Sequence, residues 1–207
     1  MSSSKEQILK KIRKALITPV PLPFPESEGD SDLFPPPGDE LDVLFAQAFT
    51  KLQGRFAYCE NEGALHQQLK ELLQEKEWSR IFCNELPWSA DYCTSSDLES
   101  CHASITGCEM LIARTGTIVL STAQQGGRTA SVYAPVHICI AYTGQLVHDV
   151  KDALIALKNK YGHQLPSFIS FATGPSRTAD IEKTLVTGVH GPKEVYLFLV
   201  EKKLREE

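Results

Sequence analysis

The chain has 207 residues, a formal net charge of -5 and a pI near 5.7. Its length suits one α/β domain with an additional arm and is short for two independent cores. The acidic balance excludes the basic footprint of a nucleic-acid-binding protein, and no stretch reaches the roughly 20 apolar residues of a spanning helix, so we expect neither nucleic acid as a partner nor a membrane span.

Residues 4–17 predict a basic amphipathic helix. Its apolar residues recur at helical spacing, and lysines and an arginine occupy the remaining surface. The proline-rich segment that follows predicts an extended strap, because proline fixes φ and removes a backbone donor. We therefore divide the chain into a helix and strap, residues 1–38, and a compact domain, residues 39–207. The helix is expected to pack on the domain or on a neighbouring subunit, so a homo-oligomer is one alternative.

The first half of the domain predicts helices and strands in alternation. Leucine and other apolar residues at helical spacing indicate helices at 41–52 and 65–73, and the apolar runs RFAYC (55–59) and RIFC (80–83) indicate strands. Residues 84–106 are polar and irregular, although ESCHASIT within them is suited to pairing at a sheet edge.

The second half contains the more strongly apolar runs. Two of them flank Arg114-Thr115-Gly116 and therefore predict a hairpin or a sharp bend. The predicted elements are strands at 109–113, 117–122, 137–142, 168–173 and 194–200, a helix near 150–157 and a short helix from about Thr178.

Apolar strands that alternate with amphipathic helices predict an α/β fold with a mostly parallel sheet covered by helices on both faces. In open sheets of this kind, ligands usually bind beyond the carboxyl ends of the strands. Three loops compete for that position, namely residues 114–117, 123–129 and 173–178.

The stretch SFATGPSRTADIEKTLVTGVHGP, residues 170–192, predicts a strand, a Gly-Pro turn and a helix start. Free backbone N-H groups at such a start can receive a phosphate or carboxylate, although acidic residues in the first turn would already complement the helix dipole. The turn is therefore either a ligand site or a purely structural corner. The candidate ligand-binding residues here are Gly174, Ser176, Arg177, Thr178, Asp180 and His190.

Two further loops offer candidate ligand-binding residues. Gly127 precedes Arg128 in a glycine-rich loop where the backbone can approach a ligand closely, but a mobile hairpin tip has the same composition. Thr115, Gly116 and Thr117 place hydroxyl groups at the expected bend, where they line a pocket or only satisfy the bend. These five residues complete the predicted anion site, and the sequence identifies no catalytic residue.

The six cysteines are too dilute for a disulfide scaffold, so we expect reduced thiols in a cytoplasm. Four of them fall between Cys83 and Cys108 without the close pairs of zinc or iron-sulfur sites. No metal or cofactor is therefore expected on this chain. A serine hydrolase is also disfavoured, because the G-x-S-x-G elbow is absent.

Three segments resemble the LUD domain of the lactate utilization protein C family (LutC/YkgG type). They are IARTGTIVLST (112–122), GRTASVYAPVHICIAY with the following HDVKDAL (127–154), and FATGPSRTADIEKTLVTGVHGPKEVYLFLV (171–200). The last is the most specific, since it combines G-P-S-R-T-A-D-I-E with G-V-H-G-P at a fixed spacing.

This resemblance implies a fold similar to the NagB/RpiA/CoA-transferase group and to 5-formyltetrahydrofolate cyclo-ligase. It also implies a role in bacterial L-lactate oxidation to pyruvate, beside partner proteins that carry iron-sulfur clusters and cysteine-rich motifs. The resemblance thus predicts an accessory subunit, and the loop residues above predict its anion-binding pocket. The alternative is a stand-alone small-molecule enzyme or binding protein that acts on a carboxylate, a phosphate or a CoA ester.

Overall fold

The computed structural model describes residues 4–17, 34, 38–85, 88–126, 129–181 and 184–201, except for a few side chains within them. Contacts divide the chain into two units, Met1–Pro36 and Pro37–Glu207. The first unit contains the predicted helix, α1 (Ser4–Leu16), whereas the predicted strap lies almost wholly outside the described residues. Among the helices that the structure describes, none is long and apolar enough to cross a membrane.

The domain is built on a five-stranded sheet in which every neighbouring pair is parallel. The strand order is β1-β11-β6-β3-β2, so the chain crosses from one edge to the other after β1 and then fills the space between. The end of the polar segment whose pairing the sequence left open forms β3, which lies inside the sheet between β2 and β6. The strands are β1 (Arg55–Cys59), β2 (Ile81–Phe82), β3 (Ala103–Thr106), β6 (Val136–Tyr142) and β11 (Glu194–Val200).

One face of this sheet is covered by helices α3 (Glu62–Glu75) and α4 (Trp88–Tyr92). Leu65 and Leu69 of α3 are fully buried against the sheet, in one cluster with strand residues such as Ile138. The helical spacing of the leucines in the sequence thus predicts the buried face of α3 correctly.

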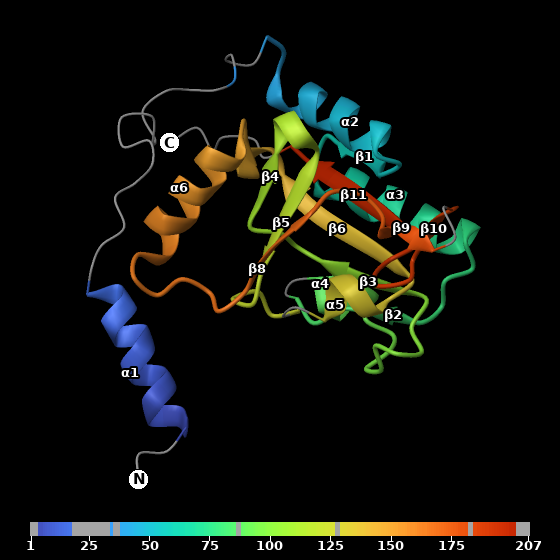
Figure 1. The fold of residues 1–207 in the computed structure, drawn as a ribbon. Helices are drawn as coiled ribbons and strands as arrows, with labels where there is room; N and C mark the ends of the chain where they lie inside the picture. The colour runs from blue at the N-terminus through green and yellow to red at the C-terminus, as the bar shows by residue number, and fades with distance from the viewer. Residues whose placement is uncertain are drawn as a thin grey trace. The chain divides into compact units, whose positions relative to one another are not determined.

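The other face is covered by α2 (Leu41–Lys51) and by a second sheet, of order β7-β4-β5-β8, so the prediction of helices on both faces is only partly right (Figure 1). Helix α6 (Val150–Tyr161) packs on the far side of that second sheet. The expected hairpin is confirmed, because β4 and β5 pair antiparallel. The strands are β4 (Met110–Ile112), β5 (Thr117–Ser121), β7 (Leu146–Val147) and β8 (Ile169–Ala172).

The second sheet escaped the sequence prediction because its inner strands, β4 and β5, are buried on both faces. Leu111 and Ile118 face the parallel sheet and α2, whereas Met110, Ile112 and Val119 face α6. A strand buried on both faces reads as a continuous apolar run whichever sheet it joins. Short elements complete the domain, namely the 3-10 helices η1 (Ala113–Thr115) and η2 (Thr143–Gln145) and helix α5 (Ala130–Tyr133).

The prediction of a helix from about Thr178 is wrong. That segment forms an antiparallel hairpin of β9 (Arg177–Ile181) and β10 (Thr184–Thr187). The segment is rich in β-branched residues, which favour strands over helices. Thus no helix N-terminus follows the Gly-Pro turn, and the free N-H groups that the predicted anion site required of such a helix are not provided.

Candidate functional site

The carboxyl ends of all five parallel strands converge on one pocket of about 910 Å³. A pocket at this edge is where open parallel sheets usually bind ligands, and its volume suits a small molecule. Most of the residues that line it lie at or after the carboxyl end of one of these strands, and three come from the loop after β5. They are Glu60, Asn61 and Glu62 after β1; Glu85 and Trp88 after β2; Gly107 and Cys108 after β3; Ala123, Gln124 and Gln125 after β5; Ile140, Tyr142, Gly144 and Gln145 in and after β6; and Val200 and Glu201 at the end of β11.

The wall of this pocket is acidic. Glu60, Glu62 and Glu201 are exposed, whereas Glu85 is buried. The phenol of Tyr142 donates a hydrogen bond of 2.7 Å to Glu62, and burial together with this contact raises the pKa of Tyr142. Among the described residues that line the pocket there is no lysine, arginine or histidine.

Glu85 lies in the wall between two glycines. Its Oε2 accepts a hydrogen bond of 2.8 Å from the backbone N-H of Gly107. A Cβ at Gly107 would lie 2.9 Å from Oε2, and one at Gly126 would lie 3.1 Å from Oε1, so the absence of side chains at both positions makes room for the carboxyl group.

Two buried polar atoms of this wall have no hydrogen-bond partner among the described residues, Oε1 of Glu85 and Nε1 of Trp88. Burial raises the pKa of Glu85, and the charge of Glu109 adds to the rise. The backbone N-H groups of Gly107 and Gly126 oppose the rise. Glu85 is therefore more easily protonated than an ordinary glutamate.

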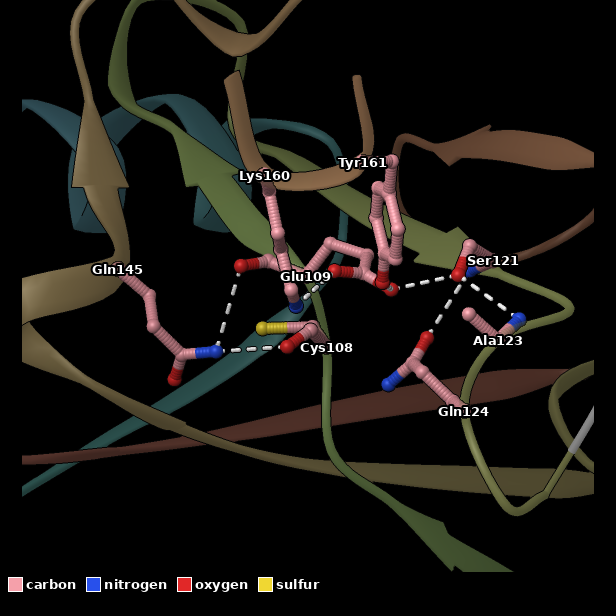
Figure 2. A network of polar contacts seen from close by, with 8 residues as sticks. All are labelled: Cys108, Glu109, Ser121, Ala123, Gln124, Gln145, Lys160 and Tyr161. Atoms are coloured by element: carbon pink, nitrogen blue, oxygen red, sulfur yellow. Dashed lines mark hydrogen bonds and ion pairs between the residues drawn. The ribbon is translucent and has the colours of Figure 1, made fainter. Parts of the chain in front are cut away.

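A second buried glutamate, Glu109, lies among residues that line the pocket, such as Cys108 and Gln145 (Figure 2). Glu109 accepts hydrogen bonds from Ser121 at 2.5 Å, Lys160 at 2.7 Å and Tyr161 at 2.8 Å. Burial alone would raise the pKa of Glu109, but these three contacts outweigh it and lower the pKa. Glu109 is thus held as a carboxylate and joins the start of β4 to the end of β5 and the last turn of α6.

The same network fixes the loop after β5. Ser121 accepts a hydrogen bond of 3.1 Å from the backbone N-H of Ala123 through its Oγ, and its own N-H donates to Oε1 of Gln124 at 3.0 Å (Figure 2). On the opposite side, the amide of Gln145 donates to the Cys108 carbonyl at 2.6 Å and accepts from the N-H of Tyr142 at 2.8 Å. These contacts hold the pocket wall in place.

The residues predicted from Thr115 to Thr117 lie at the opposite end of β5 from the pocket. The hydroxyl of Thr117 is 2.7 Å from that of Thr115 and 2.9 Å from that of Thr173. Gly116 has a φ of 60°, and a Cβ there would lie 2.5 Å from the backbone nitrogen of Phe49. β5 spans five residues, roughly 16 Å at about 3.3 Å per residue, so these hydroxyls do not line the pocket.

The Gly-Pro turn lies near the amino ends of the parallel strands. The backbone N-H of Ser176 donates to the carbonyl of Pro192, two residues before β11. The guanidinium of Arg177 donates to the Leu52 carbonyl at 2.8 Å, and a Cβ on Gly174 would lie 2.7 Å from that same oxygen. Arg177 is therefore engaged in holding the turn against the end of α2.

The remaining predicted residues are placed as follows. Thr178 and Asp180 lie in β9, and the side chain of Asp180 is not described; His190 is exposed in the turn before β11. Gly127 and Arg128 lie outside the described residues. The structure thus brings Thr115 and Thr117 together with the start of the Gly-Pro turn, away from the pocket, and the ligand-binding role of this set stays a prediction.

Sequence reasoning missed the acidic wall of the pocket. A signal was present, because Glu60 directly follows the strand RFAYC and Glu85 follows RIFC by two residues. The rule that ligands lie beyond strand ends pointed to three loops, of which residues 123–129 contribute Ala123, Gln124 and Gln125 to the pocket. No group of three or more histidine, cysteine, aspartate or glutamate side chains that could hold a metal ion occurs within the described part of the chain.

Comparisons with known proteins agree with the sequence resemblance. The family described as LUD domain matches residues 74–200. Lactate utilization protein C of Bacillus licheniformis is 36% identical over 105 residues, which cover 50% of this chain and 44% of the relative. The protein of that name in Bacillus subtilis is 34% identical over 136 residues, 64% of this chain and 56% of the relative. The chain spans about half the length of the curated relatives it matches.

A solved structure shares the fold. The crystal structure of a DUF162 family protein from Deinococcus radiodurans superposes with a TM-score of 0.58 and 21% sequence identity, over 78% of this chain and 96% of that chain. At this level of identity the likeness concerns the arrangement of strands and helices alone.

Proposed function

Since the chain belongs to the LUD domain family, we propose that it is an accessory subunit in bacterial L-lactate oxidation, working in the cytoplasm beside partner proteins that carry iron-sulfur clusters. The observation that carries this proposal is the match of about half the chain to relatives named Lactate utilization protein C. The sequence resemblance supplies the reaction and the class of partner.

The charge of the pocket supports an accessory role over direct oxidation of lactate at this site. Lactate carries a carboxylate, and Glu60, Glu62, Glu85 and Glu201 place four carboxyl groups around the pocket. Like charges repel strongly where water is partly excluded. In our proposal the lactate is therefore oxidised on a partner, and an anionic ligand is not assigned to this pocket.

The N-terminal helix supplies a surface for assembly. Ile8, Leu9 and Ile12 are exposed apolar residues on α1, and five basic residues share the helix with them. The apolar side of an amphipathic helix gains stability when a partner covers it. We assign α1 to the contact with partner proteins.

A growth experiment tests the proposal. Deletion of the gene in the bacterium that encodes it should abolish growth on L-lactate as sole carbon source and leave growth on pyruvate intact, and the full chain supplied in trans should restore growth. Normal growth of the deletion strain on L-lactate would overturn the proposal.

A second experiment tests the partners. An affinity-tagged full chain should recover proteins that contain iron and acid-labile sulfide, and a chain without residues 1–38 should recover them less well. The alternative, a stand-alone small-molecule enzyme or binding protein, predicts instead that growth on L-lactate is restored equally by the chain without residues 1–38 and that no iron-sulfur protein is recovered.

A further inference from the structure

We propose that the pocket at the carboxyl edge of the parallel sheet binds a small organic cation, an ammonium compound that also carries an oxygen acceptor. This inference depends on the pocket wall alone and not on the proposed role in lactate oxidation. It departs from the anionic ligand that the loop residues of the sequence led us to expect.

The arrangement of charge is the first argument. Four carboxyl groups come from three different turns, and the described wall offers no cation to balance them. Helix α3 explains part of this, since Asn61 caps it through a 2.9 Å hydrogen bond from the N-H of Ala64, and Glu62 complements its dipole. The helix start does not account for Glu85 or Glu201, which lie on other elements.

The burial of Glu85 is the second and independent argument. The residue is 9% exposed. Its Oε2 accepts a hydrogen bond from Gly107, whereas its Oε1 has no hydrogen-bond partner among the described residues. None of the ion pairs between described residues involves it. A buried carboxylate is stable when a cation or several donors accompany it. A positively charged ligand with N-H donors supplies both.

Trp88 gives the second feature of the ligand. Its indole is 6% exposed, and Nε1 has no acceptor among the described residues. An indole N-H only donates, so it requires an oxygen or similar acceptor on the ligand. Both groups are buried in the wall, and we expect the loop at Ala123–Gln125 to shift slightly when a ligand engages them.

The apolar part of the wall accommodates a carbon skeleton. Ile140 and Val200 come from the centre of the parallel sheet and line the same pocket as Trp88 and Tyr142. An aromatic face also attracts a cation through its quadrupole. A short alkyl chain with an ammonium group at one end and a hydroxyl at the other matches these three features.

Three probes of equal length test the proposal: the cation 4-aminobutan-1-ol, the neutral butane-1,4-diol and the anion 4-hydroxybutanoate. Each is titrated into the isotopically labelled full chain at constant ionic strength, and the indole N-H resonances of Trp78 and Trp88 are followed by NMR. The variant Trp78→Phe assigns the two peaks. We expect a saturable shift of the Trp88 peak with the ammonium probe, at least tenfold tighter than with the neutral or anionic probe.

Variants locate the effect. Glu85→Gln removes the buried charge with little change in shape and should abolish the preference for the ammonium probe. Glu75→Gln is the matched control, because Glu75 is exposed on α3 and pairs with Lys76, and it should leave the preference unchanged. If Glu85→Gln does not fold, Glu201→Gln replaces it and should weaken binding of the ammonium probe two- to threefold.

Three results would overturn the proposal. The first is an anionic probe that binds as tightly as the ammonium probe. The second is a charge preference that persists in the folded Glu85→Gln variant or, if that variant does not fold, an affinity for the ammonium probe that Glu201→Gln leaves unchanged. The third is the lack of a saturable shift at Trp88 with any of the three probes. None of these results would affect the growth test of the proposed function, so the two ideas fail separately.

Discussion

Replacement of Glu109 by glutamine should destabilise the domain by about 3 kcal/mol. In the structure Oε1 of Glu109 accepts from Ser121 and Tyr161, and Oε2 accepts from Lys160. A glutamine keeps an acceptor for the two hydroxyls, but each of these hydrogen bonds loses its charge assistance, about 1 kcal/mol apiece. The amide nitrogen of the glutamine then faces the ammonium of Lys160, so that two donors oppose each other. This repulsion accounts for the remaining loss of about 1 kcal/mol.

Replacement of Lys160, the half-exposed partner of Glu109, provides the matched comparison with Glu109→Gln. The side chain of Lys160 is 55% exposed and that of Glu109 is 1% exposed. A pair with one solvated member contributes about 1 kcal/mol or less, so Lys160→Met should cost clearly less than Glu109→Gln. Urea unfolding at pH 7, followed by circular dichroism, measures both.

The pH dependence has a defined sign. Because the pKa of Glu109 is lowered in the folded protein, its stabilisation is present above the unfolded pKa of about 4.3 and is lost as pH falls through the folded value. The gap between the wild type and Glu109→Gln should therefore narrow below pH 4. A loss under 1 kcal/mol at pH 7, or a larger loss for Lys160→Met, would refute the reasoning.

Three further substitutions have defined outcomes in the same unfolding assay. Glu85→Gln should raise stability above the folded pKa of Glu85, because a raised pKa means that stability falls as pH rises from the unfolded to the folded value. Gly116→Ala should cost roughly 2–4 kcal/mol, because φ is 60° and the new Cβ meets the backbone of Phe49. Arg177→Ala should cost about 1.5–3 kcal/mol through loss of its hydrogen bond to the Leu52 carbonyl.

Controls accompany these three substitutions. Gly144→Ala has nothing within 4 Å of the new Cβ and should be close to neutral, so an equal loss at Gly116 and Gly144 would contradict the packing argument. Glu60→Gln, at an exposed carboxylate, should not reproduce the gain of Glu85→Gln. If Arg177→Ala leaves stability unchanged but removes binding of an anion such as phosphate, the sequence prediction of a ligand site at that turn is right and the structural role is wrong.

The sequence predicts those parts of the fold that depend on local pattern. The leucines of α3 and the apolar run of β11 have the spacing of a buried helix face and a buried strand, and both elements form where predicted. Long-range pairing has no local signal of this kind. Nothing within the run of β4 tells whether it joins the parallel sheet or a second one, because it is buried on both faces.

The error at Thr178 has a different origin. The order Gly, Pro, Ser, Arg, Thr followed by acidic residues fits a helix start as well as a turn. Two contacts decide between them. One is the pairing with β10, and the other is the contact of Arg177 with Leu52, 125 positions earlier in the chain. Tertiary contacts of this range override a capping pattern of a few residues.

Two buried glutamates, 24 positions apart, show why we place the proposed binding site in the pocket and not at Glu109. Glu109 has donors for both carboxylate oxygens and a lowered pKa, so its environment is complete and its role is to fix neighbouring elements. Glu85 accepts a hydrogen bond from Gly107 through Oε2, its Oε1 has no hydrogen-bond partner among the described residues, and its pKa is raised. Opposite pKa shifts of two similar carboxyl groups distinguish a structural site with all its hydrogen bonds formed from a site that can bind a ligand. A ligand that completes the surroundings of Glu85 would be stabilised by the interaction that the folded domain lacks.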